Sequence, residues 1–148
     1  MTDTSDSQSR TRQPAVAIDR VVIGVVLASL VSIALNAAIA ALTSAALPAE
    51  GFRKGLELKE YAPLTVAGIL IGTLVWQLVR RRARDPRAVL RVLVPVAVVV
   101  SFVPDFGILA AGATLLNSLA LIAMHLVVAV VTVPILARVL PLSPSTDR

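Results

Sequence analysis

Four long apolar segments constrain the fold of this chain more than any other feature. Residues 21–49, 61–79 and 106–137 carry no acidic or basic side chain except one histidine, and residues 86–103 carry only two arginines. An α-helix rises about 1.5 Å per residue and the hydrocarbon core of a bilayer is about 30 Å thick. Each segment is therefore long enough to cross a membrane, although residues 86–103 are barely so. The sequence predicts an all-α polytopic membrane protein with a bundle of four transmembrane helices.

Composition supports burial in lipid rather than in a large soluble core. Hydrophobic residues make up 57% of the 148 residues and charged residues only 16%, whereas soluble domains have about 45–50% and about 25%. The chain has no cysteine, which excludes disulfides, thiolate nucleophiles and cysteine metal sites. Its single histidine cannot form a metal cluster alone, and we predict no metal and no cofactor.

The net charge of +5 does not indicate a nucleic-acid-binding protein. Basic residues lie at the ends of the apolar segments, where they orient membrane proteins. No aromatic residues alternate with them to form a platform on which bases would stack. We therefore exclude nucleic acid as a partner and predict the lipid bilayer instead.

Proline positions and charges give the helix boundaries. Pro48 ends the first helix, Pro63 suits the first turn of the second, and Asp85-Pro86 is a typical start for the third. The predicted transmembrane domain covers residues 18–140, between a disordered cytoplasmic tail at 1–17 and a short cytoplasmic tail at 141–148. Its four helices are predicted at residues 19–47, 63–81, 86–103 and 113–140. A cleaved signal peptide is disfavoured, because its apolar segment would be only about 7–15 residues long.

The segment between the third and fourth helices contains a turn signal, Pro104-Asp105-Phe106-Gly107. A straight helix from there to Arg138 would be about 50 Å long, well beyond the bilayer. Part of residues 106–113 must therefore be a loop, a re-entrant segment or a protruding helix, and its glycines favour a loop. Asp105 is expected to cap the turn at the membrane surface.

Arginine and lysine counts predict the orientation. With the N-terminus inside, the three cytoplasmic segments hold three, six and two basic residues, and the two outside loops hold three and none. Cytoplasmic segments of membrane proteins carry this excess of basic residues. We predict a multi-pass protein of the inner (plasma) membrane with both termini in the cytoplasm. Twelve of the fourteen basic residues are arginine, and alanine, valine and leucine dominate, which suggests a GC-rich bacterial genome. Tyr61 and Trp76, near the ends of the second helix, are expected at the headgroup level.

Polar residues within the apolar segments are the candidates for function, because lipid offers them no partner. Two sets recur at helical spacing and so form one narrow stripe on each of the first and fourth helices. These stripes are expected to face the bundle interior. The first contains Ser29, Ser32, Asn36 and Thr43, and the second contains Thr114, Ser118, His125 and Thr132, with Asn117 at its edge.

Small residues predict close helix packing. Gly68 and Gly72 form a GxxxG pattern in the second helix, and Gly24, Ala28, Ser32, Asn36 and Ala40 form a ridge at spacing four in the first. Small residues at this spacing let helix backbones approach closely. We assign Gly68 and Gly72 to helix packing within the chain, with a dimer interface as the alternative.

His125 is the sharpest single candidate. It could form a structural hydrogen bond to Asn36, Ser29 or Ser101, contact a ligand or a substrate, ligate a heme, or take part in proton transfer. A hydrolase would need a hydroxyl within about 2.6–3.2 Å of the imidazole. Ser118 lies about 10.5 Å away along the helix axis, so this hydroxyl would have to come from another helix. A proton-coupled exporter would need a membrane-embedded carboxylate, which the first, second and fourth apolar segments lack.

The sequence also resembles a family of uncharacterised four-helix membrane proteins from actinobacteria. The resemblance covers roughly residues 20–140 and is carried by Trp76 with the arginine-rich 80–87 segment, by Ser101, and by residues 121–128 with Pro134. That family has no assigned activity. The resemblance therefore implies a fold and no catalytic residues.

We predict a small integral membrane protein that is not an enzyme. It would bind a small apolar ligand or a partner helix through a polar-lined interior formed by His125, Asn36, Ser118, Ser101, Ser32 and Asn117. One alternative is a small transporter in which Asn36 and His125 line the path. Another is a membrane-embedded enzyme that acts on a lipid or isoprenoid. Besides lipid, its partners would be further copies of the chain or another membrane protein.

Overall fold

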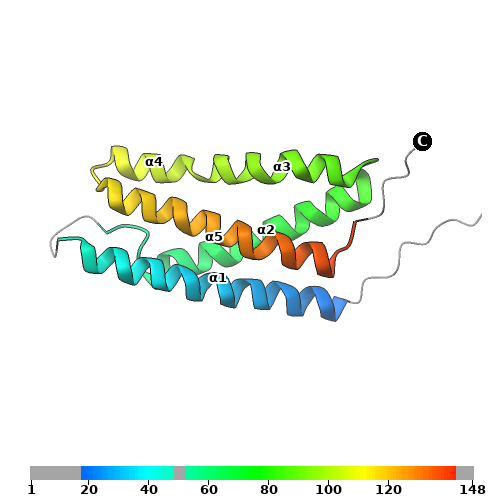
Figure 1. Ribbon diagram of the computed structural model, residues 1–148, viewed down its shortest axis with the longest axis horizontal. Helices are drawn as coiled ribbons and strands as arrows, with labels where there is room; N and C mark the ends of the chain where they lie inside the picture. Colours follow the sequence, from blue (N-terminus) through cyan, green and yellow to red (C-terminus); the bar gives the residue numbers. More distant parts are fainter. Residues whose placement is uncertain (1–17, 49–52, 143–148) are drawn as a thin grey trace, which may run out of the picture.

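The computed structural model describes residues 18–48 and 53–142, and in these residues all regular secondary structure is α-helical. The helices run up and down along one long axis (Figure 1). We call the end that holds the α2–α3 connection the arginine end, and the opposite end the loop end. In chain order the helices are α1 (Ile18–Ala46), α2 (Leu58–Arg82), α3 (Pro86–Ser101), α4 (Val103–Ala110) and α5 (Leu115–Val139).

Four helical segments are long and apolar enough to cross a membrane. They are α1, α2, α5 and the combined α3–α4 segment, Pro86–Ala110. The α2 helix begins five residues before the predicted start at residue 63. Pro63 lies inside it, where it removes only the hydrogen bond to the carbonyl of Lys59, close to the exposed start of the helix.

The predicted turn at residues 104–107 is wrong, because the chain remains helical there. Phe102 interrupts the helix with near-helical angles of φ −80° and ψ −14°, and Pro104 lies in the first turn of α4. A proline is tolerated at that position, since its missing N–H would have no partner in the helix. An unfolded turn within a span would also leave backbone groups without hydrogen bonds in lipid. The loop is therefore confined to the few residues between α4 and α5, where Gly112 has a φ of +101°.

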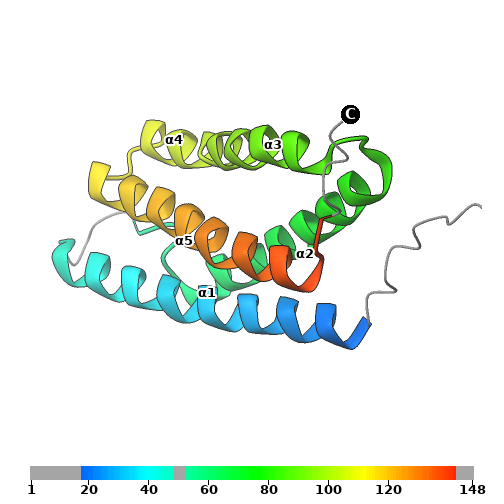
Figure 2. The same ribbon diagram turned by 45° about the vertical axis from the view of Figure 1, so that its right-hand side comes forward.

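The α5 helix is the centre of the bundle. It lies between α1 and the α3–α4 segment and contacts every other helix, as two views show (Figures 1 and 2). Its closest partner is α1, whose buried residues include Gly24, Ala28, Ser32, Asn36 and Ala40. A Cβ atom on Gly24 would lie 3.0 Å from Cγ1 of Val139. Gly24, the first residue of the predicted small-residue ridge of α1, thus lies against α5.

Two apolar clusters fill the interior. The cluster toward the loop end contains Leu47, Leu56, Tyr61, Leu121 and Met124, with Ala40 and Ala120. The cluster toward the arginine end contains Trp76, Leu90, Leu136 and Leu140. Both Tyr61 and Trp76 are buried inside the bundle, near the two ends of α2, and their expected position at the headgroup level stays a prediction. The indole N–H of Trp76 donates to the carbonyl oxygen of Leu140 at 3.1 Å, which ties the end of α5 to α2.

Large apolar side chains cover the outside of the bundle. Leu42, Leu64 and Val130 are more than 70% exposed, on three different spans. A water-soluble protein rarely exposes contiguous apolar surface on this scale. The polar side chains of the spans, by contrast, are mostly buried, so the polarity of the surface and of the interior is that of a protein surrounded by lipid.

Candidate functional site

Asp105 and His125 form an ionisable pair inside the spans. Oδ2 of Asp105, in α4, lies 3.1 Å from Nδ1 of His125, in α5. The Asp105 side chain is only 4% exposed, whereas the His125 side chain is 38% exposed. The Phe102 ring meets the imidazole edge to face, with 6.2 Å between the ring centres. A buried carboxylate thus lies behind an imidazole that reaches the surface of the bundle.

The hydrogen bonds of His125 determine which ring nitrogen is free. Nδ1 also lies 2.9 Å from the carbonyl oxygen of Leu121, one turn earlier in α5. Both neighbours are acceptors, so Nδ1 carries the proton of the neutral imidazole. The aligned hydrogen bond goes to Leu121. Oδ2 of Asp105 accepts no aligned hydrogen bond and lies beside the ring at 3.1 Å from Nδ1. Nε2 has no hydrogen-bond partner among the described residues and keeps its lone pair.

Local structure explains how Asp105 comes to this position. It lies in the first turn of α4, where a negative charge is stabilised by the helix dipole. The interruption at Phe102 starts a new helix inside the span and thereby supplies this N-terminus. Asp105 was expected to cap a turn at the membrane surface, and that interpretation is wrong. One signal for this position was present, an acid within reach of a second apolar segment, but the turn-forming residues around it favoured the membrane surface.

Asn36 and Ser32 belong to the closed interior of the bundle. The Asn36 amide donates to Oγ1 of Thr65 in α2 at 3.2 Å, and Asn36 is 1% exposed. Ser32 is fully buried. Neither the Ser32 hydroxyl nor Oδ1 of Asn36 has a hydrogen-bond partner in the described part of the chain. Asn36 does not pair with His125, as one of the predicted structural bonds required. The partner of Asn36 is Thr65, a buried residue that the sequence did not single out.

Asn117 and Ser118 lie at the loop end of α5 and are also buried. The Asn117 amide donates to the carbonyl oxygen of Lys54 at 3.1 Å, and its own backbone N–H donates to Oγ1 of Thr114, which caps α5. Lys54, in the described part of the connection before α2, is therefore tied to α5. Ser118 is 2% exposed, and its hydroxyl has no partner in the described residues.

Ser101 bonds within its own helix. Its hydroxyl donates to the carbonyl oxygen of Val98 at 2.7 Å. Within residues 18–48 and 53–142, the only polar groups that the imidazole contacts are Asp105 and the Leu121 carbonyl. The hydroxyl that a serine-type enzyme would need beside His125 is therefore missing in this arrangement.

Gly68 and Gly72 do not pack against another helix within residues 18–48 and 53–142. A Cβ atom added to either would meet nothing within 4 Å. Their predicted role in packing within the chain is therefore wrong, and the close approach occurs at Gly24 instead. The GxxxG pattern is part of the outer face of α2, so its alternative role in a dimer stays a prediction.

The six predicted polar residues therefore do not form one site. His125 and Ser101 are half-buried, and of these two only His125 lies beside a carboxyl group, that of Asp105. The other four are buried inside the bundle. The arrangement offers one imidazole lone pair at the surface of a span, backed by a carboxylate.

This fold and site define a multi-pass membrane protein of four spans with a buried carboxylate–imidazole pair. The sequence pattern of a family of unknown function, DUF6069, matches residues 11–141, and the chain belongs to that family. No curated protein and no solved structure matches this chain.

Proposed function

We propose that the protein binds a small lipid-soluble molecule through Nε2 of His125. The observation that carries this proposal is the half-exposed imidazole whose Nδ1 is held by the Leu121 carbonyl and Asp105. A histidine fixed through one nitrogen presents the other in a set direction. Since Nε2 keeps a lone pair, the ligand donates a hydrogen bond, so an apolar molecule with a hydroxyl group fits this site.

The location of His125 favours entry from the lipid rather than through the bundle interior. Asn36, Ser32, Asn117 and Ser118 are at most 2% exposed, and a ligand could reach them only by separating packed helices. His125 is flanked by Phe102, and the neighbouring Phe106 is 57% exposed. An apolar body would lie against these rings while its hydroxyl reaches Nε2. Binding therefore takes place at the α4–α5 surface.

A photoreactive probe tests this proposal directly. The protein in liposomes is illuminated with hexadecanol that carries a diazirine next to the hydroxyl, and peptide mass spectrometry locates the label. We expect labelling concentrated in α4 and in the first half of α5. The control probe is the methyl ether of the same alcohol, which cannot donate a hydrogen bond. It should label these segments several-fold less.

Variants at the pair give a second comparison. In His125→Leu, labelling of α4 and α5 should fall to the level of the ether probe. The double variant Asp105→Leu/His125→Leu serves if the single variant does not fold. Equal labelling by alcohol and ether, or labelling spread over all exposed helix faces, would remove the proposal.

Proton-coupled transport is the second candidate, and Asp105 is the observation that favours it. Such a transporter needs a carboxylate embedded in the membrane. The first, second and fourth apolar segments of the sequence contain none. Liposomes containing the protein and an internal pH-sensitive dye would report proton movement driven by an imposed potential. Transport predicts a proton flux that Asp105→Asn abolishes. A proton flux equal to that of empty liposomes would exclude transport of protons by themselves.

We also propose that both termini face the cytoplasm of a bacterial cell and that the protein lies in its inner membrane. The excess of basic residues at the arginine end supports this orientation. The chain contains no cysteine, so single cysteines can be introduced without background. A membrane-impermeant maleimide applied to intact cells should label Lys54→Cys but not Arg84→Cys. The reverse pattern would invert the topology.

A further inference from the structure

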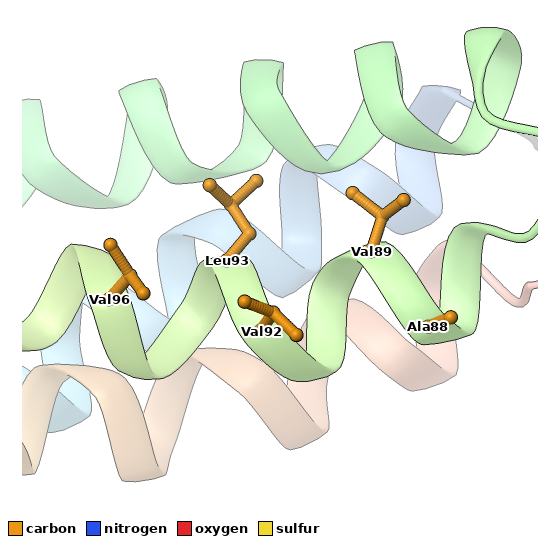
Figure 3. A pocket seen from close by; sticks show the side chains of 5 residues that line it. All are labelled: Ala88, Val89, Val92, Leu93 and Val96. Carbon is orange, nitrogen blue, oxygen red and sulfur yellow. The ribbon is translucent and has the colours of Figure 1, made fainter.

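A basic surface and an apolar groove lie next to each other at the arginine end of α3. The groove has a volume of about 510 Å³ and is lined by Ala88, Val89, Val92, Leu93 and Val96 (Figure 3). Its volume falls within the range of small-molecule sites, about 300–1,000 Å³. It opens outward, since Val92 is 64% exposed and Val96 is 51% exposed. Every lining side chain is apolar, so an acyl chain suits the groove and a water-soluble ligand does not.

Arginines flank the start of this groove. Arg91 is adjacent to Val92 in sequence and one helical turn from Ala88, and Arg87 lies one turn before Arg91. Arg84 precedes the helix in the α2–α3 connection. All three are exposed, and none pairs with a carboxylate among the described residues. The nearest acid, Asp85, uses Oδ1 to accept the backbone N–H of Ala88 at 3.0 Å and so caps α3.

The α3 helix also leaves this side uncovered. Of the four spans, Pro86–Ala110 has the smallest buried share, because α3 packs only along its contacts with α2 and α5 and its junction with α4. Arginines unpaired with acids at the end of a span attract anionic lipids, whereas neutral lipids gain little from them. The exposed arginines and the apolar groove therefore both favour an anionic lipid.

We propose that this surface is a binding site for one anionic phospholipid. Its phosphate contacts Arg84, Arg87 and Arg91, and one acyl chain lies along the groove from Ala88 to Val96. The site lies at the arginine end, whereas Asp105 belongs to the half of the α3–α4 segment nearest the loop end. It is independent of the ligand proposed for His125, and either proposal can fail without the other.

Native mass spectrometry of the protein, exchanged into detergent with equal amounts of phosphatidylglycerol and phosphatidylcholine, tests the site. We expect one retained phosphatidylglycerol per chain. Arg87→Gln/Arg91→Gln should weaken its retention by about five-fold for each arginine. The control, Arg81→Gln/Arg82→Gln, removes the same charge at the same end but from the last turn of α2 instead of α3, and it should retain the lipid.

Filling the groove distinguishes binding of the lipid at this site from a general attraction of anionic lipids to the basic surface. Val92→Phe/Val96→Phe keeps every arginine, and we expect it to lose the bound lipid while remaining folded by circular dichroism. Should this filled variant misfold, the charge-matched arginine pairs alone decide. Equal loss from both arginine pairs, equal retention of the two lipids, or release by millimolar inorganic phosphate would overturn the proposal.

Discussion

Oδ2 of Asp105 and Nδ1 of His125 lie 3.1 Å apart, on two helices that are neighbours in the bundle. The Asp105 side chain is almost fully buried, and in the described residues no lysine or arginine pairs with it. Breaking a buried ionisable pair is costly, because the remaining group stays in a medium of low polarity without a partner. Removing both members at once avoids this cost.

We therefore expect opposite results from single and double substitution of this pair. His125→Leu leaves the buried Asp105 carboxyl without its polar neighbour and should lower the free energy of unfolding by about 1–3 kcal/mol. Asp105→Leu/His125→Leu should be close to wild type in stability. Unfolding in mixed micelles with increasing SDS measures both. If the double variant is less stable than His125→Leu, the pair is not the unit that the geometry indicates.

The hydrogen bond between Asn36 and Thr65 should couple α1 to α2. A double-mutant cycle with Asn36→Ala and Thr65→Val is expected to give a coupling energy of about 0.6 kcal/mol, and at most about 1.7 kcal/mol. Thr73→Val is the control, since that hydroxyl donates to the Ile69 carbonyl within α2. Its coupling to Asn36 should be zero within error. Equal couplings for the two threonines would contradict the contact.

Close packing of α1 on α5 depends on Gly24. In Gly24→Leu the added side chain meets Ile135 and Val139, and overpacking of this kind costs about 1–3 kcal/mol. Gly72→Leu places the same side chain where nothing lies within 4 Å, so no overpacking is expected. SDS unfolding of the two variants separates a packing position from a lipid-facing one. A larger loss of stability in Gly72→Leu would instead indicate that this face contacts a second copy.

Gly55 is constrained both by its backbone angle and by a close neighbour, and comparison with Gly112, which has only the first constraint, separates the two effects. Its φ is +85°, and a Cβ atom would lie 2.7 Å from Cδ2 of Leu121. Gly112 has a φ of +101° but open space around it. Gly112→Ala should therefore cost about 1–3 kcal/mol from backbone strain alone, and Gly55→Ala should cost more. Leu121→Ala removes the atoms that a Cβ atom at position 55 would meet. It should therefore lower the free energy of unfolding less in the Gly55→Ala variant than in wild type. If the losses from the two substitutions simply add, residue 55 has moved away from Leu121 instead.

The membrane fold was predictable because its signals are local. Charge-free runs of sufficient length specify spans, and the spacing of residues such as Ser32 and Asn36 specifies which side of α1 is buried. Helix starts and breaks were harder to predict. Pro63 and the Pro104–Gly107 turn signal indicate boundaries in water, but in lipid the backbone keeps its internal hydrogen bonds wherever it can. This preference extended α2 and converted the expected turn into α4.

The partner of His125 was not predictable, because it depends on how two helices are aligned. Asp105 was assigned to the surface, so Asn36 and Ser101 remained as candidates for contact. The aspartate became available only once α4 continued the span and brought its first turn beside α5. The same limit applies to Gly68 and Gly72, because spacing identifies a small-residue face but does not show which neighbour, if any, covers it.

Nitrogen NMR of the imidazole tests the central claim most directly, because the chain contains one histidine and its two ring signals need no assignment by mutagenesis. With ¹⁵N-labelled histidine in lipid bilayers, the account predicts a proton on Nδ1, a free lone pair on Nε2, and a shift of the Nδ1 signal in Asp105→Asn. A proton on Nε2, or signals that Asp105→Asn leaves unchanged, would contradict it.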